Sequence, residues 1–221
     1  NSNYYHCGEI MRDPFYQIHW DYKKCDKQRI FFSQGSKHLK GLHILIGAVK
    51  ELVKKYEDAK IVVAGEDIYS YKNRKFGDKF YWRYLRKLIE KSGLAGKVIF
   101  LGVLDATTMA KEMAKSAVFV SASACENSPN SVCEAMLIGL PVIASDVGGV
   151  SDIITHKVDG LLYPFNSPYM LTHYIDCLFS SRDVAIGISQ NAKVSIRKKC
   201  SPEIVVSEVI SAYDNILSDK I

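Results

Sequence analysis

Short runs of consecutive apolar residues alternate along this chain with longer segments that have helical periodicity. The runs occupy residues 30–34, 60–64, 97–101, 117–121, 141–145 and 160–163. They are rich in β-branched residues, and glycine or a small polar residue follows most of them. Their apolar positions are consecutive rather than alternating, which is typical of strands that are buried on both faces of a sheet.

The segments between these runs carry apolar residues three and four positions apart, which predicts helices that each bury one face. The clearest stripes are Leu42, Leu45, Ile46, Val49, Leu52 and Val53, then Trp82, Leu85, Leu88 and Ile89, and then Met109, Met113 and Ala114. Strands that alternate with such helices form βαβ units with right-handed crossovers. The sequence therefore predicts an α/β fold, a doubly wound, parallel, six-stranded Rossmann-like sheet with helices on both faces. In such a sheet, ligands bind at the carboxyl ends of the strands.

The two ends of the chain do not fit this alternation. Residues 1–25 are aromatic and polar and contain no clear strand, while residues 202–217 predict a terminal helix with Val205, Val209, Ala212 and Ile216 on one side. We therefore divide the chain into a lead-in segment (1–25), one Rossmann-like domain (26–200) and a C-terminal helix (201–221). The chain does not begin with Met, and we expect it to be a fragment.

Composition narrows the class of protein. The chain has 221 residues, of which 48% are hydrophobic and 24% are charged, and these proportions exclude disorder, collagen and coiled coil as the main state. The net charge of +5 suits an anionic ligand or a membrane surface and is too weak to indicate nucleic acid. The six cysteines are scattered without a C-x-x-C pair, so we expect no zinc site, a reducing cytoplasmic location, and several core cysteines.

The most informative loop follows the fourth predicted strand. Ser128 and Pro129 suit an N-cap and a first helical position, and Gly139 followed by Pro141 suits a helix end. The free N–H groups and the dipole at such a helix start can bind a phosphate or diphosphate. Glu126 and Glu134 can face the same cleft and accept hydrogen bonds from sugar hydroxyls. The plainer alternative is that both glutamates are solvated or capping residues.

Glu126 and Glu134, with seven residues between them, resemble the paired glutamates of retaining glycosyltransferases of family 4. Other motifs extend the resemblance over roughly residues 29–180: Lys40-Gly41-Leu42, the second and third strands ending at Gly65 and Gly102, residues 139–149, and Asp159-Gly160-Leu161-Leu162. These enzymes have the GT-B architecture of two facing Rossmann-like domains. The resemblance implies that this chain is the C-terminal, nucleotide-sugar-binding half. Residues 1–25 would then be the tail of an N-terminal acceptor domain, toward which the terminal helix packs back.

The resemblance also implies roles for individual residues. Lys40 matches the lysine that contacts the donor diphosphate, Glu134 the glutamate that binds ribose hydroxyls, and Glu126 the glutamate near the transferred sugar. We expect Glu126 and Lys40 to be catalytic. We expect the donor to be bound by Gly35, Ser36, Lys40, Gly65, Val103, Asn127, Ser128, Asn130, Ser131 and Glu134. Many members also have an arginine after the first strand, and this chain has none, which leaves Lys37 or the backbone of Gly35 and Ser36 to replace it.

The expected reaction moves a sugar from a nucleoside-diphosphate sugar to a saccharide or lipid-linked acceptor, in the synthesis of surface polysaccharide (capsule or lipopolysaccharide) or glycolipid. A lysine and a helix start can stabilise the departing diphosphate. The chain has no D-x-D motif, so we expect neither a metal nor a cofactor. The alternatives are a sugar-nucleotide epimerase or phosphorylase of the same architecture, and a non-catalytic nucleotide-binding module. A dinucleotide dehydrogenase is disfavoured, because no G-x-G-x-x-G follows a strand.

Three further features have two interpretations each. Residues 71–91 are basic and aromatic. We expect a solvated basic face with its aromatic residues packed on the sheet, and the alternative is contact with the inner face of a membrane or a lipid-linked acceptor. Gly148 and Gly149 are expected to open the next helix, the alternative being a wall of the site. We place His38 and His43 at the surface rather than on the ligand.

Overall fold

The fold is built around a twisted parallel sheet. The computed structural model describes residue 5 and residues 7–70 and 78–218. Within this part, six strands pair side by side in the order β3-β2-β1-β4-β5-β6, and every pair is parallel. The strands are β1 (Arg29–Ser33), β2 (Lys60–Ala64), β3 (Val98–Phe100), β4 (Val118–Ser121), β5 (Val142–Ser145) and β6 (Leu161–Tyr163). The predicted doubly wound, six-stranded α/β fold is therefore confirmed.

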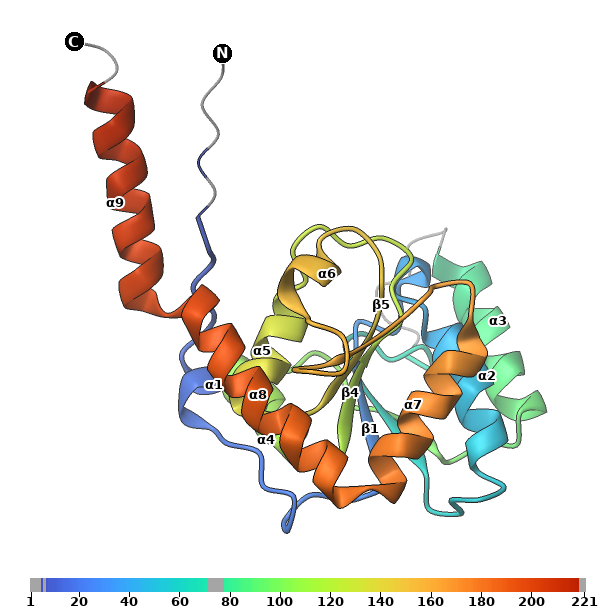
Figure 1. The fold of residues 1–221 in the computed structure, drawn as a ribbon. Coiled ribbons are helices and arrows are strands. Elements are labelled where there is room, and N and C mark those ends of the chain that lie inside the picture. The colour runs from blue at the N-terminus through green and yellow to red at the C-terminus, as the bar shows by residue number, and fades with distance from the viewer. Residues whose placement is uncertain (1–4, 6, 71–77, 219–221) are drawn as a thin grey trace.

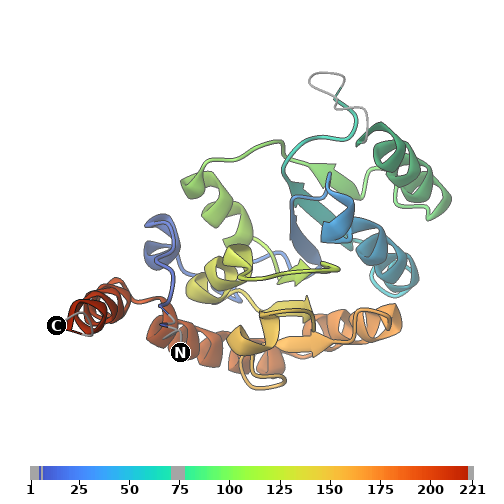
Figure 2. The same cartoon turned by 90° about the horizontal axis from the view of Figure 1, so that it is seen from above.

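Helices cover both faces of the sheet (Figures 1 and 2). On one side α2 packs against α7 and α3, and on the other α5 packs against α4, α8 and the short α1. The helices are α1 (Pro14–Gln17), α2 (Leu42–Leu52), α3 (Asp78–Lys91), α4 (Ala106–Ala114), α5 (Asn130–Ile138), α6 (Val150–Ile153), α7 (Pro168–Ser180), α8 (Arg182–Cys200) and α9 (Pro202–Ser218), with a 3₁₀ turn, η1, at His38–Lys40.

The core lies between the sheet and these helices. The predicted stripe of α2 is buried from Leu42 to Leu52, and Val53 packs partly buried against the core. Phe31 of β1 and Phe119 of β4 stack with their ring centres 6.3 Å apart. Because these strands are buried on both faces of the sheet, their sequences are continuous apolar runs.

The aromatic residues of α3 do not all behave as expected. Trp82 is buried, as expected, and donates its indole N–H to the backbone oxygen of Ser36 in the loop after β1 at 3.1 Å. Phe80 and Tyr84 are instead 66% and 50% exposed, so the expectation is wrong for these two. The helical period places them on the outer face, and Trp82, Leu85 and Ile89 form the buried stripe of this helix. The first part of the basic segment, residues 71–77, lies outside the described residues.

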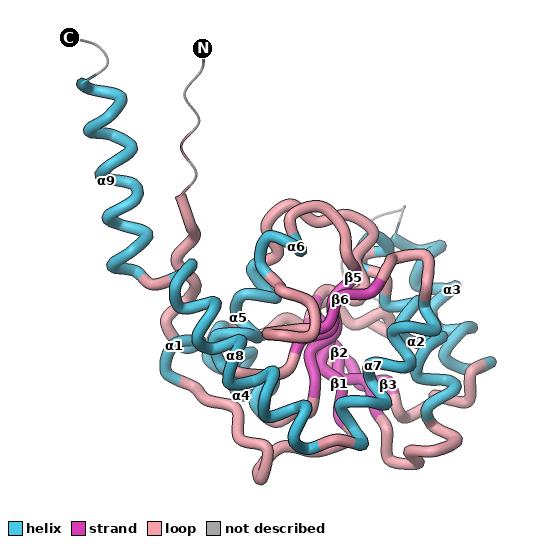
Figure 3. The backbone as a smooth tube through the Cα atoms, viewed as in Figure 1, coloured by secondary structure: helices cyan, strands magenta, loops and turns pink. Residues whose placement is uncertain are grey.

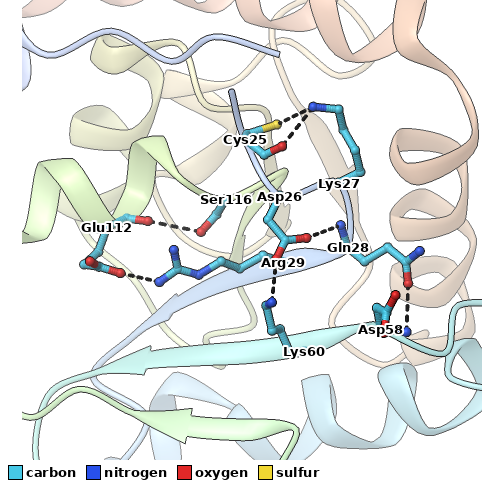
Figure 4. A network of polar contacts seen from close by, with 9 residues as sticks. All are labelled: Cys25, Asp26, Lys27, Gln28, Arg29, Asp58, Lys60, Glu112 and Ser116. Atoms are coloured by element: carbon cyan, nitrogen blue, oxygen red, sulfur yellow. Dashed lines mark hydrogen bonds and ion pairs between the residues drawn. The ribbon is translucent and has the colours of Figure 1, made fainter. Parts of the chain in front are cut away.

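Polar contacts tie the strands together at the amino edge of the sheet (Figure 4). Lys60, which begins β2, pairs with Asp26 at 2.5 Å, and the N–H of Gln28 donates to the same carboxylate at 3.1 Å. Burial opposes ionisation of Asp26, but these two hydrogen bonds hold its pKa below the ordinary value. Arg29, which begins β1, pairs with Glu112 of α4. These pairs join the segment before β1, the start of β2 and helix α4.

The lead-in segment is anchored to the domain. Met11, Phe15, Trp20 and Cys25 belong to the buried core, and α1 packs on α4 and α5. Cys133 and Cys200 are also buried, and all six thiols are free, so the expectation of several core cysteines is confirmed. The assignment of residues 1–25 to the tail of another domain stays a prediction.

The terminal helix forms as predicted, but its apolar side does not pack on the domain. α9 extends away from the body (Figures 1 and 3), and the N–H of Gly8 donates to the Glu208 carboxylate of this helix at 3.0 Å. Val205 is buried at its start, whereas Val209 and Ile216 are 36% and 42% exposed. Within the described residues, no helix combines the length and apolar character that crossing a membrane requires.

Candidate functional site

A cavity of about 640 Å³ opens at the carboxyl ends of β1, β2 and β4. Strand β1 lies between β2 and β4, so the chain winds outward in opposite directions on either side of the β1–β4 boundary. Doubly wound sheets bind their ligands at this kind of switch point, because the loops from the two neighbouring strands diverge there. The cavity therefore lies where the sequence predicts a ligand.

The loop after β1 is shaped to bring Lys40 into this cavity. Gly41 has a φ of +78°, and a Cβ there would lie 1.9 Å from the backbone oxygen of Ala122. Only glycine permits so close an approach between this loop and the loop after β4. The N–H of Ala124 donates to the backbone oxygen of Leu39 at 2.8 Å and fixes the two loops together. Gln34 also has a positive φ of +56°, an uncommon conformation for a non-glycine residue, and it lines the cavity.

Lys40 and Glu126 form the central ion pair of the cavity. Lys40 Nζ lies 2.6 Å from Glu126 Oε1, and the hydroxyl of Ser123 donates to the same oxygen at 2.6 Å. The loop that carries Glu126 lies directly against Gly148, where a Cβ would come within 1.8 Å of the Glu126 backbone oxygen. The lysine and the glutamate come from two loops that the sheet topology places side by side.

Helix α5 begins one residue later than the sequence predicts. Its first residue is Asn130, and its N-cap is Pro129 with φ −79° and ψ 86°, without a capping bond from a side chain. The prediction that Ser128 is the N-cap and Pro129 the first helical residue is therefore wrong, because the ψ of Pro129 lies outside the helical range. In the described part of the chain, the N–H of Ser131 donates to no other group. The predicted helix end at Gly139 is confirmed by its left-handed φ of +82°.

Glu134, one turn into α5, is held by an arginine from the lead-in segment. Arg12 Nε donates to Oε1 at 2.7 Å and Arg12 Nη2 donates to Oε2 at 2.9 Å. The hydrogen bonds that Arg12 donates to Glu134 raise the pKa of the Arg12 guanidinium above its ordinary value. Sequence reasoning missed Arg12, because it lies 122 residues from its partner and no periodicity connects the two.

Most of the predicted site residues line this cavity. They are Ser36, Lys40, Gly65, Val103, Glu126, Ser128, Asn130, Ser131 and Glu134, and Lys37 lies among them. Gly35 lies behind the wall, where a Cβ would come within 2.7 Å of side-chain atoms of Val63 and Leu42. Asn127 lines an adjoining cavity of about 670 Å³ together with Gly148 and Gly149. The lining residues that the sequence analysis did not predict as part of the site include Arg12, Gln34, Glu66, Leu104 and Met109.

Two subsidiary expectations can be compared with this geometry. Gly149 is the N-cap of α6, so the pair Gly148 and Gly149 does open the next helix, and both residues also line the adjoining cavity. His38 and His43 are not among the lining residues of either cavity. His43 Nδ1 lies 3.1 Å from the hydroxyl of Tyr81, and burial lowers the pKa of His43.

Comparison with known proteins agrees with this fold. The family of glycosyl transferases group 1 matches residues 17–195, which include both loops of the cavity and both glutamates. The chain belongs to this family. The crystal structure of the C-terminal domain of a group 1 family protein, LpcC of Francisella tularensis, matches it with a TM-score of 0.67 and 25% identity, over 86% of this chain and 94% of that one.

Other members and solved structures are longer than this chain. An uncharacterized glycosyltransferase of Methanocaldococcus jannaschii is 31% identical over 189 residues, which are 85% of this chain and 45% of that protein. The putative glycosyltransferase YtcC of Bacillus subtilis is 25% identical over 88% of this chain and 47% of its own length. Anabaena HepE in complex with UDP-glucose has the same fold, with a TM-score of 0.73 at 24% identity, over 86% of this chain and 49% of that one. The chain thus spans about half the length of the curated relatives it matches.

Proposed function

We propose that this group 1 family domain is the donor-binding half of a retaining glycosyltransferase, which moves a sugar from a nucleoside-diphosphate sugar to a saccharide or lipid-linked acceptor. The observation that carries the proposal is the convergence of Lys40, Glu126, Glu134 and the start of α5 on one cavity at the switch point of the sheet. The binding of UDP-glucose by Anabaena HepE, which has the same fold, supports a ligand of this class.

The diphosphate would lie between Lys40 and the start of α5. Lys40 would supply a positive charge, and the N–H of Ser131 would supply a hydrogen-bond donor together with the positive end of the helix dipole. Glu134 lies four residues after Asn130, which is about 6 Å along the helix axis. The ribose of the same nucleotide would therefore reach the Glu134 carboxylate when its diphosphate occupies the helix start.

The remaining parts of the donor fit on either side. Gly65 and Gly102 form an isolated bridge that joins the loops after β2 and β3, and the neighbouring Val103 is 82% exposed at the cavity rim. The main chain of this rim would contact the base. On the other side, Glu126 lines the cavity and the next residue, Asn127, lines the adjoining one, so the transferred sugar would lie near these two residues.

Departure of the nucleoside diphosphate leaves negative charge on its terminal phosphate. Lys40 and the N–H of Ser131 at the start of α5 would stabilise that charge, and donors held in place before the reaction lower a transition-state barrier. We assign no nucleophile to the chain, and the acceptor would be bound by an N-terminal domain. That no metal takes part stays a prediction; within the described residues, no group of three or more His, Cys, Asp or Glu could hold one. The enzyme would serve surface polysaccharide or glycolipid synthesis in the cytoplasm, at the inner face of the membrane.

Calorimetric titration of the chain with UDP, GDP, ADP and dTDP tests the donor site. We expect one of these diphosphates to bind more tightly than its nucleoside, since Lys40 and α5 act on the phosphates. Absence of binding by all four would contradict the proposal. Incubation of the full-length protein with labelled nucleotide sugars and acceptors then separates transfer from the alternatives, because an epimerase would convert the donor itself and a non-catalytic module would leave it unchanged.

A further inference from the structure

Arg12 reaches the cavity from the segment before α1, outside every motif that marks the family. Its Nε and Nη2 occupy both oxygens of Glu134, whose side chain is only 6% exposed. The Arg12 side chain is itself 48% exposed, and its guanidinium carbon lies 5.0 Å from the ring centre of Phe15. One edge of the guanidinium is thus bound to Glu134, and Arg12 also lines the open cavity.

The backbone around Arg12 is held in place, so that only its side chain can move easily. Phe15 is fully buried, and the N–H of Met11 donates to the hydroxyl of Tyr16 at 2.9 Å. That hydroxyl donates in turn to the backbone oxygen of Cys200 at 2.6 Å. The N–H of Trp20 donates to the backbone oxygen of Ile138 at 2.8 Å. The segment therefore presents Arg12 to the site as a fixed part of the domain.

The described lining of the cavity contains three cations and three carboxylates, and they form three pairs. Lys37 lies 3.5 Å from Glu66, Lys40 lies 2.6 Å from Glu126, and Arg12 lies 2.7 Å from Glu134. The wall is thus electrically balanced in the absence of a nucleotide. A diphosphate brings several negative charges, so its binding is strengthened if some of these cations turn from their carboxylates to the phosphates.

Glu134 makes this exchange necessary. If Glu134 binds the ribose hydroxyls, as the proposed function requires, its oxygens cannot keep both hydrogen bonds to Arg12. A carboxylate this deeply buried would also lose its only described counterion if Arg12 simply left for solvent. The helix start, where the diphosphate would lie, is about 6 Å from Glu134. An arginine side chain can turn from one to the other without movement of the backbone, and its planar fork suits phosphate oxygens.

We propose that Arg12 is a diphosphate-binding residue of this site, which turns from Glu134 to the diphosphate when the nucleotide enters and so frees Glu134 for the ribose. This inference rests on the proposed function. It gives the site a second cation beside Lys40, from a segment outside the sheet. The loop after β1 contains lysines but no arginine.

The test compares UDP with uridine, or the matching pair for whichever base the wild-type chain binds. Calorimetry and NMR titration give the affinities for the nucleoside diphosphate and for the nucleoside. They are measured for the wild type, for Arg12→Ala and for Arg12→Lys, which keeps the positive charge but loses the planar guanidinium. Arg83→Ala, an exposed arginine of α3, is the matched control. We expect Arg12→Ala to lower the affinity for UDP by about tenfold or more. The affinity for uridine should stay the same or rise, because Glu134 is then free to bind the ribose. Arg12→Lys should lose less of the affinity for UDP, and Arg83→Ala should bind both ligands with the wild-type affinities.

Other outcomes overturn the inference in distinguishable ways. Equal weakening of UDP and uridine means that Arg12 only supports the fold of the site. Tighter binding of both ligands means that Arg12 only blocks Glu134. If Arg12→Ala does not fold, the Arg12→Lys variant and the Arg12 Nε–H signal of the wild type decide, and a signal that UDP leaves unshifted refutes the exchange. If the wild-type chain binds no nucleoside diphosphate, the proposed function itself has failed.

Discussion

Replacement of Glu134 by alanine should remove the ribose contact and little else. In the ligand-free protein the change leaves Arg12 without its partner, but Arg12 is 48% exposed and can be hydrated, so the fold should tolerate it. A hydrogen bond to a buried carboxylate contributes about 1.5–3 kcal/mol. The wild type must break the Glu134–Arg12 pair before the ribose binds, which offsets part of this gain. We therefore expect a loss near the lower limit, about tenfold in the affinity for UDP.

The assay is a cycle that changes the protein and the ligand in turn. Calorimetry gives the affinities of UDP and 2′-deoxy-UDP for the wild type, Glu134→Ala and Glu134→Gln. The wild type should prefer UDP, and Glu134→Ala should bind both ligands equally, because the group that recognises the hydroxyl is gone. Glu134→Gln keeps one carbonyl acceptor and should keep part of the preference. If Glu134→Ala retains the full preference for UDP, Glu134 does not bind the ribose, and the reasoning from its position on α5 is refuted.

Three further predictions use other residues of the site and the chain as a whole. Lys40→Ala should weaken the binding of UDP far more than that of uridine in titration calorimetry. This difference should shrink as the salt concentration rises and should not change when a chelator is added, and equal losses for both ligands would mean that Lys40 has a structural role. Gly148→Ala should lower the melting temperature and displace Glu126, because the new Cβ would lie 1.8 Å from the Glu126 backbone oxygen. Gly47→Ala should instead stabilise the fold by about 0.5–1 kcal/mol, because Gly47 lies in α2 and a Cβ there would meet nothing within 4 Å. The opposite ranking in thermal unfolding would contradict this steric argument. The 221-residue chain alone should show no sugar transfer in a labelled-donor assay, because it spans about half of its relatives; robust transfer would overturn the division into donor and acceptor halves.

Sequence alone predicted the elements whose cause is local. All six strands appear within a residue or two of their predicted positions, because a strand buried on both faces must be apolar throughout. The helix end at Gly139 and the opening of α6 at Gly149 also follow from local backbone preferences. Given parallel strands, the placement of Lys40 and Glu126 at one edge of the sheet followed as well, since both lie after the carboxyl ends of strands.

Only the tertiary structure decided which groups face each other across that edge. It placed Pro129 outside α5, it left the apolar side of α9 largely unpacked, and it brought Arg12 onto Glu134 across 122 residues. Periodicity reports which face of an element is buried, but it carries no information about which distant side chain will meet a given residue. That meeting depends on strand order, on close approaches such as Gly41 on Ala122, and on the balance of charges around the cavity. These properties exist only once the whole chain has folded, and they determine how the site holds its charges before a ligand arrives.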